Sequence, residues 1–506
     1  MSSSSFRFLH VSDVHLGCPH YQSKERQRDF FLAFESVIER FALPLKEGDP
    51  PQVDFVVIPG DLFDSRNLQP ITLSRASYVL SLLRDEGIPV FASEGNHDTA
   101  QHRYRGEPSW YNYLAGEGFL HYLQDRVEGG EVFFDPWDDE DLCGGYYDLP
   151  NGVRIIGTQW YGTRAEAMLE PIVAGLSSLS PADFTIMLFH GGLTDYVGSS
   201  SGGAEYEQFI KLRPYVDYLA LGHIHKQYQR QNWMFNPGSL EVTKINDYFE
   251  KHGVLRVSVE LGGDSPEITA EHLSDYRRRP VVWMSLSCDL YSTPIQLEQA
   301  IRDLIDTEGK DKLEQCRREF PSDIEFVDPI CYLELTGTLG FPFSEIPLSE
   351  LEPWIMEELG AAIFRHHNRT IPRKLGGEED FLLDDGRIDR EALERKVFTR
   401  LIADDTRFKE ASDALADWAV SLKQEILMGD VSAKERERFV ERLGEILDDI
   451  DPETGLALEE VDSPNVTLSE DDGGGTSPLN KDNMDSSLSA VEEVVEEEDS
   501  QGERNL

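Results

Sequence analysis

Short polar segments rich in aspartate, histidine and asparagine follow apolar runs at five places in the first half of the chain. The densest is EGNHD (94–98), which follows the apolar run IPVFA (88–92). A simple turn needs only the glycine or the asparagine. The adjoining histidine therefore indicates chemistry rather than a mere change of direction. The other segments are DVH (13–15), GDLFD (60–64), FHGG (189–192) and GHIH (222–225).

Seven side chains in these segments are candidate metal ligands: Asp13, His15, Asp61, Asn96, His190, His223 and His225. Carboxylate, imidazole and amide groups suit Mn²⁺, Fe²⁺ or Mg²⁺, with imidazole favouring the transition metals. Two pairs are spaced i, i+2 and share a face of an extended backbone, so each pair can clasp one cation or reach two neighbouring ones. Seven ligands suit two cations, about 3.5–4 Å apart, which is a standard device for phosphoester hydrolysis.

His97 is one ligand too many for such a centre. It is better used as a general acid for the leaving oxygen, or as a cation on the developing charge, than as a structural histidine. Gly95 is expected to give the turn its conformational freedom. Asp98 can be either a partner of a ligand or a turn cap, and His10, within an apolar run, is expected to be a hydrogen-bonded core histidine.

Strands alternating with helices must position these side chains. Apolar runs such as FRFLHV (6–11), VDFVVI (53–58) and FTIMLF (184–189) indicate strands, and FFLAFESVIERFALP (30–44) and TLSRASYVLSLLRDEG (72–87) indicate amphipathic helices. This alternation predicts an α/β domain with more than one sheet. In open α/β sheets, ligands bind at the carboxyl ends of the strands, where the polar segments lie.

The remainder of the chain divides into three parts. We expect the first domain to span residues 1–275, a small α+β domain to follow at 280–367, a helical segment at 385–450, and a disordered acidic tail at 451–506. The helix at 348–364 is expected to end in the basic cluster RHHNR (365–369). This cluster and RRR (277–279) could touch phosphate, or be a helix terminus and a solvated linker respectively.

Composition points to an intracellular, strongly acidic protein. The net charge is −48; the tail contributes −15 and leaves −33 on residues 1–450, which should repel polyanions at long range. Five scattered cysteines suggest neither a disulfide framework nor a zinc ribbon. The N-terminus has no signal-peptide pattern and no stretch reaches the ~18 apolar residues of a membrane helix, so a cytoplasmic location without membrane contact is expected.

The five motifs, in this order, resemble those of the calcineurin-like metallophosphoesterases. The resemblance implies an α/β fold of four layers, an α/β/β/α sandwich, here with a smaller α+β cap domain and C-terminal helices. It also implies a first metal site of Asp13, His15, Asp61 and His225, and a second of Asp61, Asn96, His190 and His223. Asp64 would orient His97 as its catalytic partner.

Within this superfamily the chain looks most like the SbcD branch of DNA-repair exonuclease subunits, because FLHVSDVHLG, GDLFDS and NPGSLEVT (236–243) add to the shared motifs. The resemblance implies a metal-dependent phosphodiesterase acting on DNA ends, using two divalent cations, with Mn²⁺ expected and Mg²⁺ or Fe²⁺ possible. It further implies a homodimer and an SbcC-type coiled-coil ATPase partner docked on helices near the C-terminus.

Two alternatives remain open. A small-molecule or protein phosphoesterase would keep the chemistry and change the substrate, although protein phosphatases of this superfamily typically carry DRG and GNHE where this chain has DSR (64–66) and GNHD. A non-catalytic DNA-end-binding scaffold would be favoured by the loss of a ligand. All seven ligand positions are filled here, which favours an enzyme.

Overall fold

The computed structural model describes residues 4–99, 109–197, 202–262, 265–372, 390–403 and 411–428, with a few isolated positions (408, 409, 438, 440 and 442–444). It divides into two compact units, residues 1–375 and residues 376–506, which we describe separately. The predicted acidic tail lies outside the described residues.

Two six-stranded sheets form the centre of the first unit. The first sheet has the order β16-β15-β1-β2-β3-β4 and the second has the order β13-β14-β12-β9-β8-β7. Strands β1 to β4 are mutually parallel, as are β8, β9, β12 and β14, and antiparallel strands lie at the edges. The strand bounds are β1 Ser4–His10, β2 Phe55–Pro59, β3 Val90–Ser93, β4 His121–Tyr122, β7 Tyr146–Asp148, β8 Val153–Gly157, β9 Phe184–His190, β12 Tyr218–Gly222, β13 Tyr228–Arg230, β14 Met234–Asn236, β15 Val254–Leu261 and β16 Glu267–Leu273.

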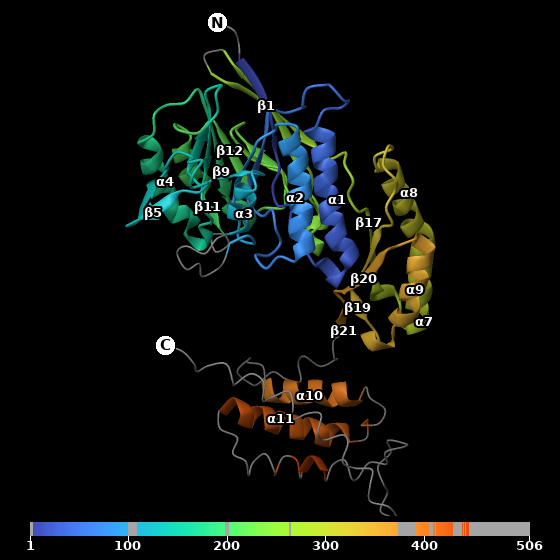
Figure 1. The fold of residues 1–506 in the computed structure, drawn as a ribbon. Coiled ribbons are helices and arrows are strands. Elements are labelled where there is room, and N and C mark those ends of the chain that lie inside the picture. Colours follow the sequence, from blue (N-terminus) through green and yellow to red (C-terminus); the bar gives the residue numbers. More distant parts are fainter. Residues whose placement is uncertain are drawn as a thin grey trace, which may run out of the picture. The chain divides into compact units, whose positions relative to one another are not determined.

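The two sheets pack face to face, because alternate residues of each strand point into a shared apolar core. In β9, Ile186 and Leu188 enter this core, whereas Met187 and Phe189 enter the core on the outer side. Helices α1 (Lys24–Phe41) and α2 (Pro70–Asp85) cover the outer face of the first sheet, and α4 (Ala165–Ser177) covers that of the second (Figure 1). The predicted four-layer α/β/β/α sandwich is therefore confirmed.

Shorter elements decorate this sandwich. They are α3 Trp110–Gly116, β5 Arg126–Glu128, β6 Glu131–Phe133, β10 Gly192–Leu193, α5 Thr194–Val197, β11 Gly203–Ala204 and α6 Tyr206–Phe209, with 3₁₀ turns η1 His20–Gln22, η2 Gly162–Arg164, η4 Ile210–Leu212 and η5 Ile245–Phe249. None of the helices in the described part of the chain combines the length and apolarity needed to cross a membrane.

A separate apolar core lies in residues 281–372. Parallel strands β17 (Val281–Ser287), β18 (Ile330–Thr336) and β20 (Ile363–Asn368) form its sheet, in that order. Around it are α7 Pro294–Leu304, the π-helical turn η7 Ile305–Gly309, α8 Lys310–Glu319 and α9 Leu348–Leu359, with η6 Cys288–Leu290, η8 Phe343–Glu345, β19 Thr338–Leu339 and β21 Ile371–Pro372. We refer to residues 281–372 as the small domain.

The helix expected at 348–364 stops earlier than predicted. Gly360 adopts a left-handed conformation with φ of 56° and caps α9 after Leu359, and the chain then turns into β20. The basic cluster RHHNR therefore lies on a strand and not at a helix end, so the helix-dipole explanation of its charge is wrong.

The second unit contains the helix pair α10 (Arg390–Ala403) and α11 (Ser412–Met428). Arg395 pairs with Asp417 between the helices, and Ala416 and Val420 are buried. The predicted helix at 411–429 is thus present. The rest of the segment expected at 385–450 lies largely outside the described residues.

Candidate metal centre

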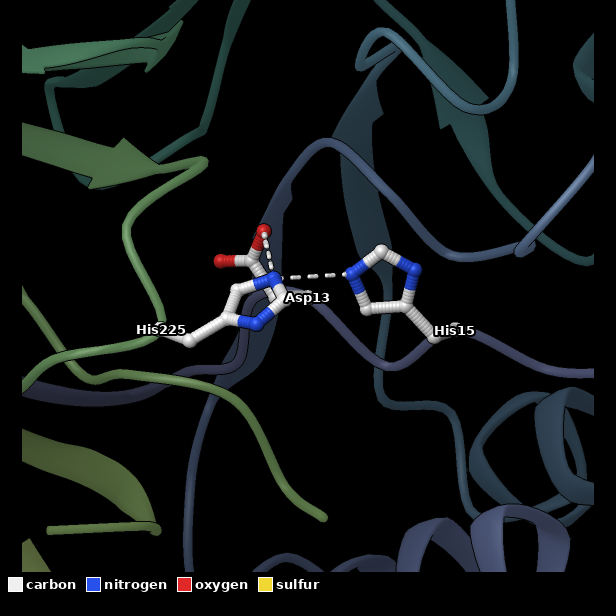
Figure 2. A group of neighbouring side chains, drawn as sticks. All are labelled: Asp13, His15 and His225. Carbon is white, nitrogen blue, oxygen red and sulfur yellow. Dashed lines mark hydrogen bonds and ion pairs between the residues drawn. The ribbon is translucent and has the colours of Figure 1, made fainter. Parts of the chain in front are cut away.

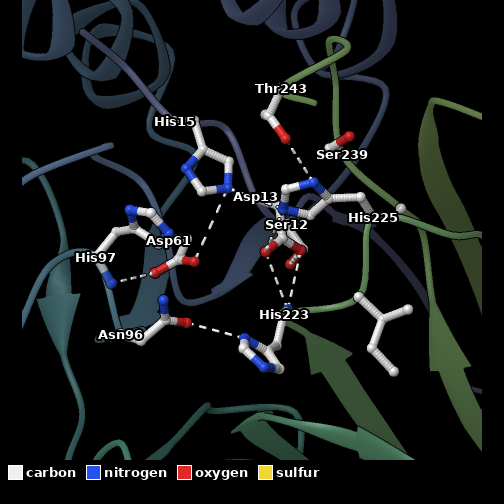
Figure 3. A network of polar contacts seen from close by, with 12 residues as sticks. Ser12, Asp13, His15, Asp61, Asn96, His97, His223, His225, Ser239 and Thr243 are labelled. Carbon is white, nitrogen blue, oxygen red and sulfur yellow. Dashed lines mark hydrogen bonds and ion pairs between the residues drawn. The ribbon is translucent and has the colours of Figure 1, made fainter. Parts of the chain in front are cut away.

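The candidate ligands converge at the carboxyl ends of five strands from the two sheets. Figure 3 labels all of them except His190. Asp13 and His15 follow β1, Asp61 follows β2, and Asn96 follows β3. In the second sheet, His190 ends β9, and His223 and His225 follow β12. Because these strands are neighbours within their sheets and the sheets are stacked, residues 212 positions apart in the chain reach one site.

The backbone is strained at several of these positions. Asp13, His15 and Asp61 have φ between 51° and 52°, and His223 has φ of 77°. Non-glycine residues rarely adopt this left-handed region, which costs on the order of 1–3 kcal/mol each, and such residues cluster at functional sites. Half of the eight non-glycine residues with positive φ in the described part of the chain are candidate ligands.

The first ligand group consists of Asp13, His15 and His225 (Figure 2). The Nε2 atoms of His15 and His225 lie 3.0 Å apart, and Nε2 of His225 lies 3.8 Å from Oδ1 of Asp13. All three side chains contribute an atom to one small space. We refer to this set as group one.

The hydrogen bond at Nδ1 of His225 determines whether its Nε2 carries a lone pair or a proton. Nδ1 lies 2.8 Å from a carboxylate oxygen of Asp247, which can only accept, so Nδ1 carries the proton. A neutral His225 therefore aims the lone pair of Nε2 at Nε2 of His15. Two imidazole nitrogens 3.0 Å apart share either a proton or a cation, and metal–nitrogen distances of about 2.0–2.1 Å fit a common cation.

The second group consists of Asp61, His190, His223 and Asn96, and we refer to it as group two. Nε2 of His190 lies 3.2 Å from Oδ2 of Asp61 and 3.1 Å from Oδ1 of Asn96. Nδ1 of His223 lies 2.9 Å from the same amide oxygen. Nδ1 of His190 donates to the carbonyl oxygen of Pro59 at 2.8 Å, which leaves Nε2 as the ligand nitrogen.

Asp61 faces both groups. Its Oδ2 is 3.2 Å from His190 and 3.9 Å from Nε2 of His15 in group one. Burial alone would raise the pKa of this carboxyl, but the neighbouring His190 and His15 hold it well below its usual range. Conversely, although burial favours the neutral ring, the Asp61 carboxylate raises the pKa of His190 to about 9. The centre therefore attracts positive charge, as a cation site must.

Two glycines are required by the closeness of this packing. A Cβ atom on Gly95 would lie 2.1 Å from Oδ1 of Asp61, and one on Gly60 would lie 2.2 Å from Nδ1 of His190. Gly60 also has φ of +93°, whereas Gly95 is not in the positive range. The expectation that Gly95 supplies conformational freedom is therefore replaced by a steric reason: there is no room for a side chain.

Asp98 ties two ligand loops together. Its carboxylate accepts hydrogen bonds from the backbone N–H groups of Asp61, Phe63 and Gly95 at 2.8–2.9 Å, and from the Tyr111 hydroxyl at 3.0 Å. Burial and the nearby Asp61 charge raise the pKa of Asp98 to about 7. Asp98 is thus more than a turn cap, because it positions the backbone of the loop that carries Asp61.

His97 lies beside group one, as predicted, with its ring centroid 4.8 Å from that of His15. Its Nδ1 donates to the backbone carbonyl of Asp64 at 2.7 Å, and not to the Asp64 carboxylate. That carboxylate lies 3.3 Å from Nδ1 of His15. The expected pairing of Asp64 with His97 is therefore made through the main chain, which fixes the His97 proton on Nδ1 and leaves Nε2 free to exchange one.

The sequence did not reveal the residues that contact the candidate ligands and orient them. Asp247 and Thr243 both contact Nδ1 of His225, at 2.8 and 2.7 Å. Trp160 packs against His190 and His223, with ring centroids 5.4 and 4.9 Å away. Thr243 is the last residue of the NPGSLEVT segment, which the family resemblance had already singled out. Asp247 and Trp160 lie among residues with no metal-binding pattern.

Two other sequence interpretations can be compared with the structure. His10 is fully buried and bonds Tyr218 and the carbonyl of Leu221 at 3.0 Å, so its assignment to the core is confirmed. Arg279, of the RRR segment, is also buried and forms ion pairs with Asp29. Arg279 is therefore neither part of a solvated linker nor available to contact phosphate.

The fold and the paired ligand groups define a metallophosphoesterase domain. Residues 6–227 match the calcineurin-like phosphoesterase family. The curated relatives include DNA double-strand break repair proteins Mre11. The protein from Archaeoglobus fulgidus is 33% identical over 222 residues, which cover 43% of this chain and 46% of the relative.

Two further relatives extend this similarity. The Mre11 protein of Methanocaldococcus jannaschii is 26% identical over 55% of this chain and 69% of its own length. The uncharacterized metallophosphoesterase YhaO of Bacillus subtilis is 26% identical over 56% of this chain and 63% of its own length. The chain thus matches about half to two thirds of the length of these three relatives.

Proposed function

We propose that the protein is a metal-dependent phosphodiesterase that hydrolyses DNA phosphodiester bonds at DNA ends. The observation that carries the chemistry is the pair of ligand groups facing one shared carboxylate, Asp61. The donor set of imidazole, carboxylate and amide oxygen favours Mn²⁺, with Mg²⁺ or Fe²⁺ as alternatives. DNA as the substrate is supported by the names of the relatives, which are DNA double-strand break repair proteins.

Two cations, when bound, would offset phosphate charge and lower the pKa of an attacking water. The chain's own residues supply orientation and a proton. Asp13, His15, Asp61, Asn96, His190, His223 and His225 are the proposed ligands. His97, with its Nδ1 proton fixed by the carbonyl of Asp64, presents Nε2 to donate a proton to the leaving 3′ oxygen.

A nuclease assay on linear duplex DNA with Mn²⁺ or Mg²⁺ tests this proposal. We expect His97→Ala to lower the rate by roughly 10²- to 10⁴-fold while Mn²⁺ binding stays intact. Asp64→Asn is the matched control, because it keeps the carbonyl that holds His97 and changes only the carboxylate beside His15. Asp64→Asn should therefore need a higher Mn²⁺ concentration to reach half of its maximal rate, and its rate at saturating Mn²⁺ should equal that of the wild type.

The substrate and the chemistry can fail separately in this assay. If the wild type leaves DNA intact and rapidly cleaves bis(p-nitrophenyl) phosphate, the centre is a phosphodiesterase but the DNA assignment is wrong. If the wild type binds Mn²⁺ and cleaves neither substrate, the protein is a binding module rather than an enzyme.

The same proposal includes a homodimer and a coiled-coil ATPase partner of the SbcC type. Exposed apolar side chains support both: Ile71 and Tyr78 on α2, and a row at helical spacing on α10 formed by Leu393, Val397 and Leu401. We assign residues 1–275 to the nuclease domain, 280–367 to the cap domain and 385–450 to partner docking.

Size-exclusion chromatography with light scattering tests the dimer. The charge substitution Val397→Glu tests docking, and it should abolish co-elution with the ATPase subunit.

A further inference from the structure

The turn η5 carries a carboxylate that fixes one metal ligand. Oδ2 of Asp247 lies 2.8 Å from Nδ1 of His225, and it accepts hydrogen bonds from Oγ1 of Thr243 at 2.6 Å and the backbone N–H of Lys244 at 3.1 Å. Its own carbonyl oxygen accepts from Nε2 of His252 at 2.9 Å. Asp247 is therefore held at both its side chain and its backbone, and it holds His225 in turn.

The next residue along η5 contacts the small domain. The ring of Tyr248 stacks on Trp283 of β17, with centroids 5.4 Å apart and planes at 13°. Trp283 stacks in the same manner on Tyr332 of β18, at 5.3 Å and 29°. A single peptide bond thus separates the residue that holds a group-one ligand from the residue on which the small-domain sheet rests.

Group one also reaches the small domain along a second path. Tyr21, six residues beyond His15, packs its ring 5.8 Å from that of Tyr332. The guanidinium of Arg365, on β20, lies 4.8 Å over the ring of Tyr21. Both segments that continue from group-one ligands therefore touch the same small-domain sheet.

The packing beside Tyr248 leaves room for movement. A cavity of about 270 Å³ lies between the two domains, lined by Tyr248 and by Val281, Lys312 and Cys316 of the small domain, among others. The stack on Trp283 is thus a contact that a shift of the small domain can tighten or release.

We propose that Asp247 and Tyr248 form a positioning pair, through which the seating of the small domain sets the orientation of His225 and the affinity of group one for its cation. This inference rests on the proposed function, since it requires the two-cation centre. Coupling between sites is reciprocal. A cation bound at group one therefore strengthens the seating of the small domain to the same degree.

Titration of the full-length, metal-free protein with Mn²⁺ by calorimetry tests the pair. Asp247→Asn should weaken one of two Mn²⁺ sites by about 10- to 100-fold, as is typical for residues that orient a ligand. Tyr248→Ala should weaken the same site by roughly 3- to 10-fold, within the range of coupling mutations. Tyr248→Phe keeps the ring on Trp283 and should therefore bind Mn²⁺ with the same affinity as the wild type.

Arg40→Ala provides a control for general loosening between the domains. Arg40, on α1, pairs with Asp275 and with Asp323 of the small domain, and so spans the same joint through residues outside η5. Its Mn²⁺ affinities should equal those of the wild type. Equal losses in Arg40→Ala and Tyr248→Ala, or wild-type affinity in Tyr248→Ala, would overturn the coupling. A wild type that binds fewer than two Mn²⁺ ions would instead overturn the proposed function.

Hydrogen exchange tests the reverse direction. Mn²⁺ should slow exchange in β17 of the wild type, because cation binding secures the stack between Tyr248 and Trp283. In Asp247→Asn at Mn²⁺ concentrations that saturate both sites, this protection should be lost. Protection of the same size in the variant would show that the small domain responds to the cation by another route, and the positioning pair would be rejected.

Discussion

The phosphoesterase domain contains two clusters of buried charged side chains that are built differently. One is the ion network at the joint with the small domain, formed by Arg26, Asp29, Glu241 and Arg279, which we call the joint network. There Arg26 contacts Asp29 at 2.8 Å and Glu241 at 3.0 Å, and Arg279 contacts Asp29 at 2.8 Å. Two positive and two negative groups face one another, so the cluster is neutral.

The other cluster is the pair of ligand groups. In the described part of the chain, no arginine or lysine forms an ion pair with Asp13, Asp61 or Asp64. Nitrogen faces nitrogen between His15 and His225, and the backbone is left-handed at several ligands. A cluster made for stability pairs opposite charges, whereas a cluster made for a cation leaves acceptors facing each other and stores strain.

Removing the shared carboxylate should give the largest effect. We expect Asp61→Asn to lower phosphodiesterase activity by at least about 10³-fold, because both ligand groups lose their common anion. In the metal-free protein, at a pH above the His190 pKa of about 9, the substitution should cost less than about 1 kcal/mol of unfolding free energy, because no protonated histidine then loses its counter-charge. Activity assays and urea unfolding in the presence of a chelator measure the two quantities. Full activity in this variant would contradict the site assignment.

The joint network should respond in the opposite way. Asp29→Ala removes the carboxylate that both arginines contact and leaves buried positive charge uncompensated. We expect a loss of about 3–5 kcal/mol in unfolding free energy, with Mn²⁺ affinity at group two unchanged. Urea unfolding and calorimetry measure these effects. A loss below about 1 kcal/mol would show that this cluster, too, is not built for stability.

The same contrast explains what the sequence could predict. The candidate ligands stand at strand ends, four of the seven next to a glycine, in five motifs whose residue types already indicate cation chemistry. All seven could therefore be predicted as candidates, and the structure brings them together. The alternation of strands and helices likewise predicted an α/β domain with more than one sheet, and the family resemblance implied its four layers. The left-handed backbone and the tautomers of His190 and His225 depend on tertiary neighbours and could not be predicted.

The joint network and Asp247 were missed for a physical reason. Asp29 and Arg279 are 250 positions apart, and neither lies in a pattern that distinguishes a buried charge from a solvated one. Asp247 acts only because η5 folds back on His225. The predicted end of the helix at 364 is wrong because Gly360 caps α9, and a single glycine in a helical pattern does not by itself mark the end of the helix.

His10 provides a histidine to compare with those of the ligand groups. Burial lowers its pKa to about 3, in spite of its bond to the Leu221 carbonyl. Because the folded-state pKa lies below the unfolded value of about 6.5, His10 contributes stability above pH 6.5 that is lost as the pH falls. We expect roughly 1.4 kcal/mol per pH unit from this residue between about pH 6.5 and 5. Urea unfolding at about pH 7 and 5.5 should show a smaller difference for His10→Gln than for the wild type, and identical differences would contradict the assignment.

Substitution of Tyr111 tests whether Asp98 belongs with the ligand groups or with the structural cluster, and it should have the smallest effect of these substitutions. Asp98 lies among the ligand loops, yet it is surrounded by donors, as in the joint network: its partners include the backbone N–H of Asp61 and the Tyr111 hydroxyl. Tyr111→Phe removes one of these buried hydrogen bonds and should cost about 0.5–1.5 kcal/mol of unfolding free energy. Phosphodiesterase activity and Mn²⁺ affinity should stay within about twofold of the wild type, because three backbone donors still hold the Asp98 carboxylate. A drop in activity of tenfold or more, with stability unchanged, would place Asp98 with the ligand groups rather than with the structural cluster.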